Sequence, residues 1–334
     1  MATIKDVARL AGVGVATASR VISGSGSFSA DAARRVQAAA QQLGFRPSAI
    51  ARALSLRSTG TVGVFVPDFK GPFYGPLLDA IDTELRAHGC HMVAANGCGD
   101  ADSRQQSIDG ARFLIERGCD GIVVCSNALR DADFVRLRAG FANIAVVNRE
   151  VRGMKSRCFT ADHHAGGRAA ADALLAHGHR RIAVVRGPAG AGDNHQRLLG
   201  LFERLAEDGI GMDQVLVEEG DFSPASGWAA AERLLARRRA ISALFCANDQ
   251  MAMGALSCVQ SSGVRVPAQW SVVGYDDSDV AAFLSPRLTS VHIPIAAMGL
   301  NACRLLLNPR RDAPLAVSRT FEPRVVMRDS LARV

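Results

Sequence analysis

Side chains suited to binding a polyhydroxylated ligand follow several of the short apolar runs in this 334-residue chain. Aromatic rings can stack on the apolar face of a sugar ring, while carboxylates, amides and guanidinium groups bond its hydroxyls. We predict that these residues form one site for a small sugar. The predicted set is Phe73, Tyr74, Arg149, Asp162, Arg197, Phe222, Asn248 and Asp276.

A different interpretation exists for some of these residues. Aspartate also caps helices, and for Asp68, Asp162 and Asp249 a helix cap is an equally good interpretation. Phe222 could belong to the hydrophobic core. The sequence leaves these alternatives open.

The elements that must position this site alternate regularly from residue 61 onward. Short apolar runs, rich in β-branched residues, alternate with amphipathic helical segments, which predicts parallel, doubly wound sheets. The length of this part exceeds one compact sheet, so we expect two similar α/β lobes. In such sheets ligands bind at the carboxyl ends of the strands. The runs are 61–67, 91–96, 121–126, 143–149, 181–187, 215–220, 243–249 and 270–277.

The first 60 residues have a different character. They contain eight Lys and Arg against two acidic residues, a net charge of +6, whereas the rest of the chain carries +1. Residues 1–44 read as three short helices: Thr3 to Asp6 resembles a capping box, Gly12 marks a turn, and a Gly/Ser-rich loop covers 23–29. A basic module on a near-neutral body is typical of a protein that binds a polyanion.

Two short helices joined by a glycine turn in a basic segment indicate a helix-turn-helix, whose second helix enters the major groove of DNA. Its first turn would carry Val15, Ala16 and Thr17. Small apolar side chains suit thymine methyl groups, and Thr17 can bond a base or a phosphate. Ser19 lies about one turn further, beside Arg20, which can reach guanine or phosphate.

The runs IKDVARLAGVGVATASRVISG and GFRPSAIARALS resemble the headpiece and hinge helix of the LacI/GalR family, especially its galactose repressor branch. The likeness continues to about residue 328. It implies that Leu54 wedges between base steps in the minor groove. Two positions depart from the family pattern: Gly14 replaces the usual Ser, and Ser23 the common Asn. The predicted DNA-binding residues are Thr3, Val15, Ala16, Thr17, Ser19, Arg20, Ser23, Ser48, Ala51 and Leu54.

The resemblance implies an all-α helix-turn-helix headpiece at 1–46, a hinge at 47–60 and a periplasmic-binding-protein-like core at 61–334. The first lobe would comprise about 61–160 and 292–325, and the second about 161–291. Arg197, Asn248 and Asp276 match the usual effector-binding positions of the family. The resemblance also implies a homodimer that binds pseudo-palindromic double-stranded operator DNA under the control of a small effector.

The sequence is less consistent with three other functions. In a purine-responsive repressor, Phe73, Tyr74 and Phe222 would sandwich a flat base; against this, Arg149 replaces the tryptophan of the purine type, and 187–192 lacks that branch's arginine. A sugar-binding transport protein is disfavoured by the basic headpiece and the charged N-terminus, which lacks the apolar run of a signal peptide. An α/β enzyme such as a nucleotide-using kinase lacks its phosphate loop.

The sequence does not indicate nucleotide, metal or catalytic sites. The run at 187–192 is spaced G-x-x-G-x-G, without Gly-Lys-Ser/Thr, so no nucleotide cofactor is predicted. The histidines at 163–164 and 177–179 lack partners at zinc spacing, and no G-x-S-x-G motif occurs. The eight cysteines form no C-x-x-C pair and read as reduced core residues. We therefore expect a cytoplasmic regulator that is not an enzyme, with neither metal nor cofactor.

Overall fold

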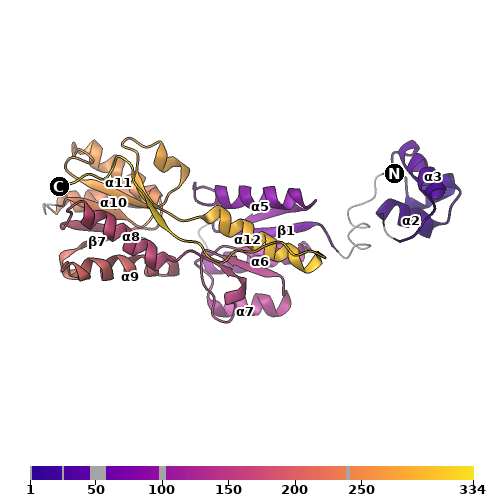
Figure 1. Cartoon of the computed structure of the whole chain (residues 1–334), viewed down its shortest axis with the longest axis horizontal. Coiled ribbons are helices and arrows are strands. Elements are labelled where there is room, and N and C mark those ends of the chain that lie inside the picture. The colour runs from indigo at the N-terminus through magenta and orange to yellow at the C-terminus, as the bar shows by residue number, and fades with distance from the viewer. Residues whose placement is uncertain (1, 25, 46–57, 98–102, 238–240) are drawn as a thin grey trace. The chain divides into compact units, whose positions relative to one another are not determined.

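The computed structural model of the chain describes residues 2–24, 26–45, 58–97, 103–237 and 241–334. It divides into two compact units, Met1–Thr61 with Gly118–Asp120, and Val62–Arg117 with Gly121–Val334 (Figure 1). Most of the expected hinge at 47–60 lies outside the described residues, and so do Ser48, Ala51 and Leu54.

The first unit contains the three expected helices α1 (Ile4–Ala11), α2 (Val15–Ser23) and α3 (Ala30–Gln42). Their apolar faces meet in a small core that contains the buried side chains of Val7, Ala18 and Val36. The core forms because apolar residues recur at helical spacing on each segment. The predicted three-helix headpiece is confirmed.

The first lobe of the second unit is built on a five-stranded sheet of order β2-β1-β3-β4-β5, in which the pairs β1–β3, β3–β4 and β4–β5 are parallel. Helices α5 and α12 pack against each other (Figure 1). The strands are β1 (Thr61–Val66), β2 (His91–Asn96), β3 (Gly121–Val124), β4 (Ile144–Val147) and β5 (Cys158–Phe159). The helices are α5 (Gly75–Ala87), α6 (Ser103–Glu116), α7 (Asp131–Gly140) and α12 (Ile295–Leu307).

The second lobe is built on a six-stranded sheet of order β11-β10-β9-β8-β6-β7. Two tightly packed helix pairs cover it, α8 with α9 and α10 with α11 (Figure 1). The strands are β6 (Ile182–Arg186), β7 (Leu216–Glu219), β8 (Ala243–Cys246), β9 (Ser271–Asp276), β10 (Thr289–His292) and β11 (Arg324–Val326). The helices are α8 (His163–Ala176), α9 (Gly192–Glu207), α10 (Pro224–Ala236) and α11 (Asp249–Ser261).

All eight apolar runs contain a strand, and the two doubly wound lobes are confirmed. The central strands are buried along their whole length, as strands covered on both faces must be. Strands β5, β10 and β11 were not among the expected runs. Strand β11 pairs antiparallel with β10 in the second sheet, so the chain has left the first lobe before Arg324, not at about residue 325.

Two glycines allow α8 and α9 to approach closely. A Cβ atom on Gly167 of α8 would lie 1.8 Å from the carbonyl oxygen of Arg197, and one on Gly200 of α9 would lie 2.0 Å from that of His164. No side chain fits at such distances. This packing brings the first turn of α8, with His163, beside the segment of α9 that carries Arg197.

Candidate functional site

The first helix of the headpiece begins with the predicted capping box. The Thr3 hydroxyl accepts from the backbone N–H of Asp6, whose carboxylate accepts from that of Thr3. Gly12 ends the helix with a φ of +63°, a left-handed conformation that favours glycine. Thr3, predicted to contact DNA, is exposed and also fixes the start of α1.

The predicted recognition face of α2 is open to solvent. Val15 is 45% exposed although apolar. Ala16, Ser19 and Arg20 are exposed and Thr17 is half-buried, whereas Ala18 and Val21 point into the core. An exposed apolar residue beside small polar ones is what a helix needs in order to contact base edges.

Two predicted DNA contacts are engaged within the headpiece. Arg20 Nε donates to the Ala16 carbonyl at 3.3 Å, and its Nη1 to that of Ser27 at 3.5 Å. The Ser23 hydroxyl donates to the Ser19 carbonyl at 2.8 Å. Gly14 provides no side-chain cap to α2, as expected from its departure from the family's serine.

The second candidate site lies where the strand order of each sheet reverses. In the first sheet this point falls between β1 and β3, and in the second between β6 and β8. The loops that leave the carboxyl ends of such strands diverge and form a crevice that binds ligands. Residues from these loops meet across the two lobes, as the contacts of Asp193 with Asn127 and Asn148 show.

Arg197 is at the centre of the site and is only 1% exposed. Its Nη2 donates to Asp193 Oδ2 at 3.3 Å, and its Nη1 donates to the Ala247 carbonyl at the end of β8. The guanidinium carbon lies 3.7 Å from the centre of the Tyr275 ring, a cation–π contact. Nε is buried and has no hydrogen-bond partner within the described chain. Burying a guanidinium group with one donor unpaired is unfavourable, so the arrangement suits a ligand that supplies an acceptor.

Asp193, in the first turn of α9, joins the lobes. Its Oδ1 accepts from Asn127 Nδ2 at 3.0 Å, and its Oδ2 from Asn148 Nδ2 at 3.2 Å. Both asparagines follow strands of the first sheet, β3 and β4. One buried carboxylate of the second lobe therefore takes hydrogen bonds from two loops of the first.

His163 extends this network. Its Nε2 lies 3.0 Å from Asn148 Oδ1 and its Nδ1 lies 3.1 Å from the Tyr275 hydroxyl. Burial, followed by the nearby charge of Arg197, lowers the pKa of His163 to about 4, so the ring is neutral at pH 7. Because Asn148 Nδ2 donates to Asp193, its Oδ1 must accept, so His163 donates from Nε2 and accepts the Tyr275 proton at Nδ1.

Two carboxylates beside β9 differ in their surroundings. Asp249 is 1% exposed and accepts from the N–H and hydroxyl of Ser278 and from the Ser290 hydroxyl. Burial raises its pKa to about 6. Asp276 has a φ of +107°, and no hydrogen bond from a described residue reaches its carboxylate. Burial raises the pKa of Asp276 well above its usual value, although the charge of Arg197 opposes this, and the charges of Asp249 and Asp193 raise it further. Backbone strain with an unpaired half-buried carboxylate is typical of a functional position.

Of the predicted aromatic residues, Tyr74 lies near Asp193 and Asp276, and Phe73 packs against Tyr74. The rings of Phe73 and Tyr74 lie 5.0 Å apart at 76°. Burial raises the pKa of Tyr74, and so do the nearby Cys125, Asp193, Asp68 and Asp276, which places Tyr74 close to the acidic residues.

Phe222 has a φ of +72°, and its ring packs on Gly187, where a Cβ atom would lie 2.2 Å away. Asn248 caps α11 through Met251 and donates to the Phe222 carbonyl at 3.0 Å, holding that strained residue in place.

Arg149 and Asp162 have other roles in this structure. Arg149 Nη2 pairs with Asp131 Oδ1 at 3.0 Å, and its guanidinium also bonds the Leu129 carbonyl and lies over the Phe134 ring. Asp162 is exposed and caps α8 by accepting from Ala165 N–H at 2.8 Å. The helix-cap alternative holds for Asp162, whereas Asn248 takes the cap position that was considered for Asp249.

The sequence analysis missed Asn127, Asp193 and His163. Asp193 stands four residues before Arg197, a spacing that places both on one face of a helix. That signal was available. Asn127 directly follows the run at 121–126 and so stands at a strand end, and the sequence suggests for His163 only the metal-ligand interpretation.

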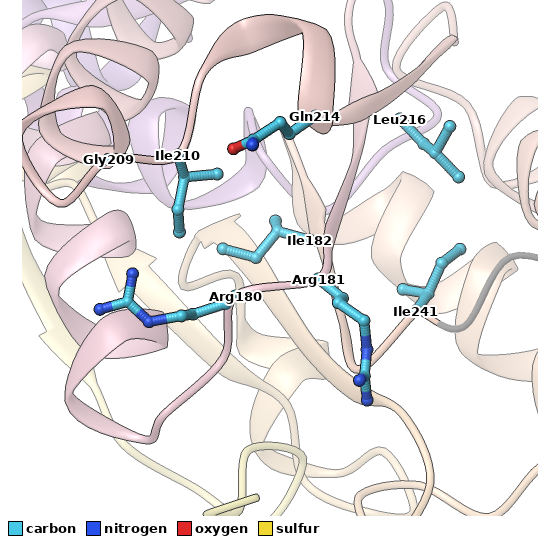
Figure 2. A pocket seen from close by; sticks show the side chains of 8 residues that line it. All are labelled: Arg180, Arg181, Ile182, Gly209, Ile210, Gln214, Leu216 and Ile241. Atoms are coloured by element: carbon cyan, nitrogen blue, oxygen red, sulfur yellow. The ribbon is translucent and has the colours of Figure 1, made fainter.

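A separate pocket of about 520 Å³ opens at the other edge of the second sheet (Figure 2). Arg180 and Arg181 precede β6, Gln214 precedes β7 and Ile241 precedes β8, so the pocket lies at the amino ends of these strands. It is distinct from the crevice at their carboxyl ends.

The described ranges offer neither a metal site nor a membrane-spanning helix. They contain no group of three or more His, Cys, Asp or Glu arranged to hold a metal ion. No helix within them is long and apolar enough to cross a membrane.

Comparison with known proteins identifies both parts of the chain. The family of bacterial regulatory proteins named lacI matches residues 3–48, and a periplasmic binding protein-like domain matches 171–331. The transcriptional regulator GalR of Escherichia coli is 36% identical over 333 residues, covering 99% of this chain and 96% of its own. The transcriptional repressor PurR of Proteus mirabilis is 32% identical over 341 residues, covering 99% of this chain and 97% of its own. The lac repressor dimer bound to operator and the anti-inducer ONPF superimposes with a TM-score of 0.85 at 25% identity, covering 99% of each chain.

Proposed function

Since the chain belongs to the LacI family of bacterial regulatory proteins, we propose that it is a repressor whose affinity for operator DNA is controlled by a galactose-like sugar. The dimer reads two half-sites of a pseudo-palindromic operator, because a two-fold symmetric protein matches a two-fold symmetric sequence. Helix α2 contacts the bases through Val15, Ala16 and Thr17. Leu54 of the hinge inserts into the minor groove between the two half-sites.

The polar character of the crevice carries the proposal of a sugar. Asp193 and the unpaired Asp276 offer acceptors, and Arg197 offers a donor. A neutral polyol matches this set because each hydroxyl both donates and accepts. An anionic effector would meet the carboxylate of Asp193, which already pairs with Arg197.

The geometry favours a sugar over a purine. The rings of Phe73 and Tyr74 are inclined at 76° to each other, so these two neighbours cannot stack on opposite faces of a flat base. Arg149, which stands where the purine type has tryptophan, is paired with Asp131.

Fluorescence anisotropy of a labelled galactose-type palindromic operator tests the proposal. Purified protein is titrated at fixed salt with no effector, with each sugar of a panel and with purines. We expect tight, sequence-specific binding that D-galactose or a related sugar changes. The variant Arg197→Met is the matched control, expected to bind operator while losing the sugar response.

A response to purines alone would overturn the assignment of the crevice. If the protein binds neither this operator nor any duplex selected from a random pool, the proposed repressor function is wrong.

A further inference from the structure

The pocket at the amino ends of β6, β7 and β8 has an aliphatic inner surface. It occupies about 520 Å³, and Ile182, Ile210 and Ile241, which line it, are almost fully buried (Figure 2). Leu216, at the start of β7, is half-buried beside them. A cavity of this size with a mostly apolar lining is typical of a site for a small organic ligand.

Two cations lie at the rim of this pocket. Arg180 and Arg181 directly precede β6, and both are exposed. None of the described lining residues carries a carboxylate. The carboxylate of Asp208, which precedes the lining residue Gly209, pairs with Arg204 at 2.9 Å. The positive charge of the rim is therefore not neutralised from within the pocket.

The polar groups of the rim keep donors for a ligand. The side chain of Arg181 makes no hydrogen bond or ion pair with a described residue. Arg180 uses Nη1 to donate to the Asp208 carbonyl at 2.9 Å, which holds the turn after α9. Gln214 accepts from the Gly211 N–H through Oε1 at 3.0 Å, so its Nε2 can still donate.

We propose that this pocket binds a small organic carboxylate with an aliphatic body. The hydrocarbon part packs on the isoleucines, which Figure 2 shows between Gln214 on one side and the two arginines on the other. The carboxylate faces the guanidinium groups, whose planar donors match its geometry. The described lining residues include no aromatic side chain, so an aliphatic body fits better than a flat ring.

This ligand is separate from the effector of the proposed function. The crevice lies at the carboxyl ends of the strands, where ligands of such sheets usually bind, and the pocket lies at their opposite ends. Failure of the sugar response would leave this inference standing, and failure of carboxylate binding would leave the proposed function standing.

Octanoate is the probe, and isoleucine methyl signals of the full-length protein show where it binds. The δ1 methyl groups are observed by NMR during a titration below the micelle-forming concentration. The variants Ile182→Val, Ile210→Val and Ile241→Val assign the three pocket signals. We expect saturable shifts of these three and none at Ile122 and Ile144, which lie in the first sheet. Unchanged pocket signals, or equal shifts at all isoleucines, would overturn the site.

The variant Arg181→Gln tests the role of the charge. An exposed ion pair of this kind changes a dissociation constant by about twofold to fivefold, so octanoate should bind the variant more weakly by that factor. Octanol, which has no charge, should bind the variant and the wild type equally. Arg136→Gln, which changes an exposed arginine of α7, is the matched control and should bind octanoate like the wild type. Arg180 is left in place because it holds the turn after α9.

Butyrate tests the role of the apolar lining. It is four methylene groups shorter than octanoate, and each buried methylene group contributes about fourfold to affinity, so butyrate should bind at least tenfold more weakly. Equal binding of octanoate and butyrate, or equal octanoate binding by Arg181→Gln and the wild type, would overturn the proposed class of ligand.

Discussion

We predict that Asp276 contributes to sugar binding but lowers the stability of the folded core, and the variant Asp276→Asn tests this. The side chain is half-buried, and no described residue donates to its carboxyl group. Burial raises its pKa, the charge of Arg197 opposes this, and the charges of Asp249 and Asp193 add to the rise. An unsatisfied buried polar group costs about 1–3 kcal/mol, and more when charged. The backbone at φ +107° adds strain that Asn tolerates better than most residues.

We expect Asp276→Asn to stabilise the core by about 1 kcal/mol and to weaken sugar binding. In a domain of this size that gain raises the melting temperature by roughly 2–4 °C. A hydrogen bond contributes about 0.5–1.5 kcal/mol, so D-galactose should bind about two to ten times more weakly. Operator affinity without sugar should stay within about twofold of the wild type, because the loss affects the ligand-bound state.

Thermal unfolding and isothermal titration calorimetry with D-galactose measure the two effects on one preparation. Asp279→Asn is the matched control, because Asp279 is exposed in the short helix after β9. A variant at Asp276 that melts at a lower temperature and binds sugar like the wild type would refute the reasoning.

Three other predictions concern pH and DNA. Folding lowers the pKa of His163 from 6.5 to about 4, so His163 makes the free energy of unfolding rise by about 3 kcal/mol between pH 4 and 6.5. Folding raises the pKa of Asp249 from 3.8 to about 6, so Asp249 makes the free energy of unfolding fall by a similar amount between pH 3.8 and 6. Urea unfolding between pH 4 and 7 should therefore show stability rising with pH in Asp249→Asn and falling in His163→Gln, and unchanged wild-type profiles in both would contradict the pKa assignments. Leu54→Ala should bind operator at least tenfold more weakly in the anisotropy assay and bind sugar like the wild type; equal loss of both would refute the separate roles of hinge and crevice. Arg20→Ala should weaken operator binding by about 1–3 kcal/mol. If Arg20 contacts a phosphate, the loss should be equal for all sequences and the salt dependence shallower; if Arg20 contacts a guanine, sequence specificity should relax. Operator binding equal to the wild type would exclude both contacts.

The elements and their order were predictable because they depend on local patterns. Helix α2 follows from apolar residues at helical spacing, with Ala18 and Val21 inward and Val15 outward, and strand β4 follows from a short, wholly apolar run. The two-residue β5 is too short for a periodic signal. Strand β11 depends on pairing with β10, which is distant in the sequence.

The site was predictable only in part. Arg197 and Asp276 stand at positions that the family resemblance indicates, and both lie in the crevice. Whether Asp162 caps a helix or binds a ligand depends on exposure, which the sequence does not encode locally. The role of Arg149 depends on Asp131, and that of His163 on partners 15 and 112 residues away. Such contacts arise only when the chain folds and brings residues distant in the sequence together.

The central claim is that a sugar bound in the crevice and an operator bound by the headpiece influence each other. Operator affinity is measured at zero and saturating D-galactose, and D-galactose affinity at zero and saturating operator. Linkage requires that the sugar change operator affinity by the same factor as the operator changes sugar affinity. We predict equal factors of about 5–150, the usual range for allosteric coupling. Specific sugar binding that leaves operator affinity unchanged would contradict the account.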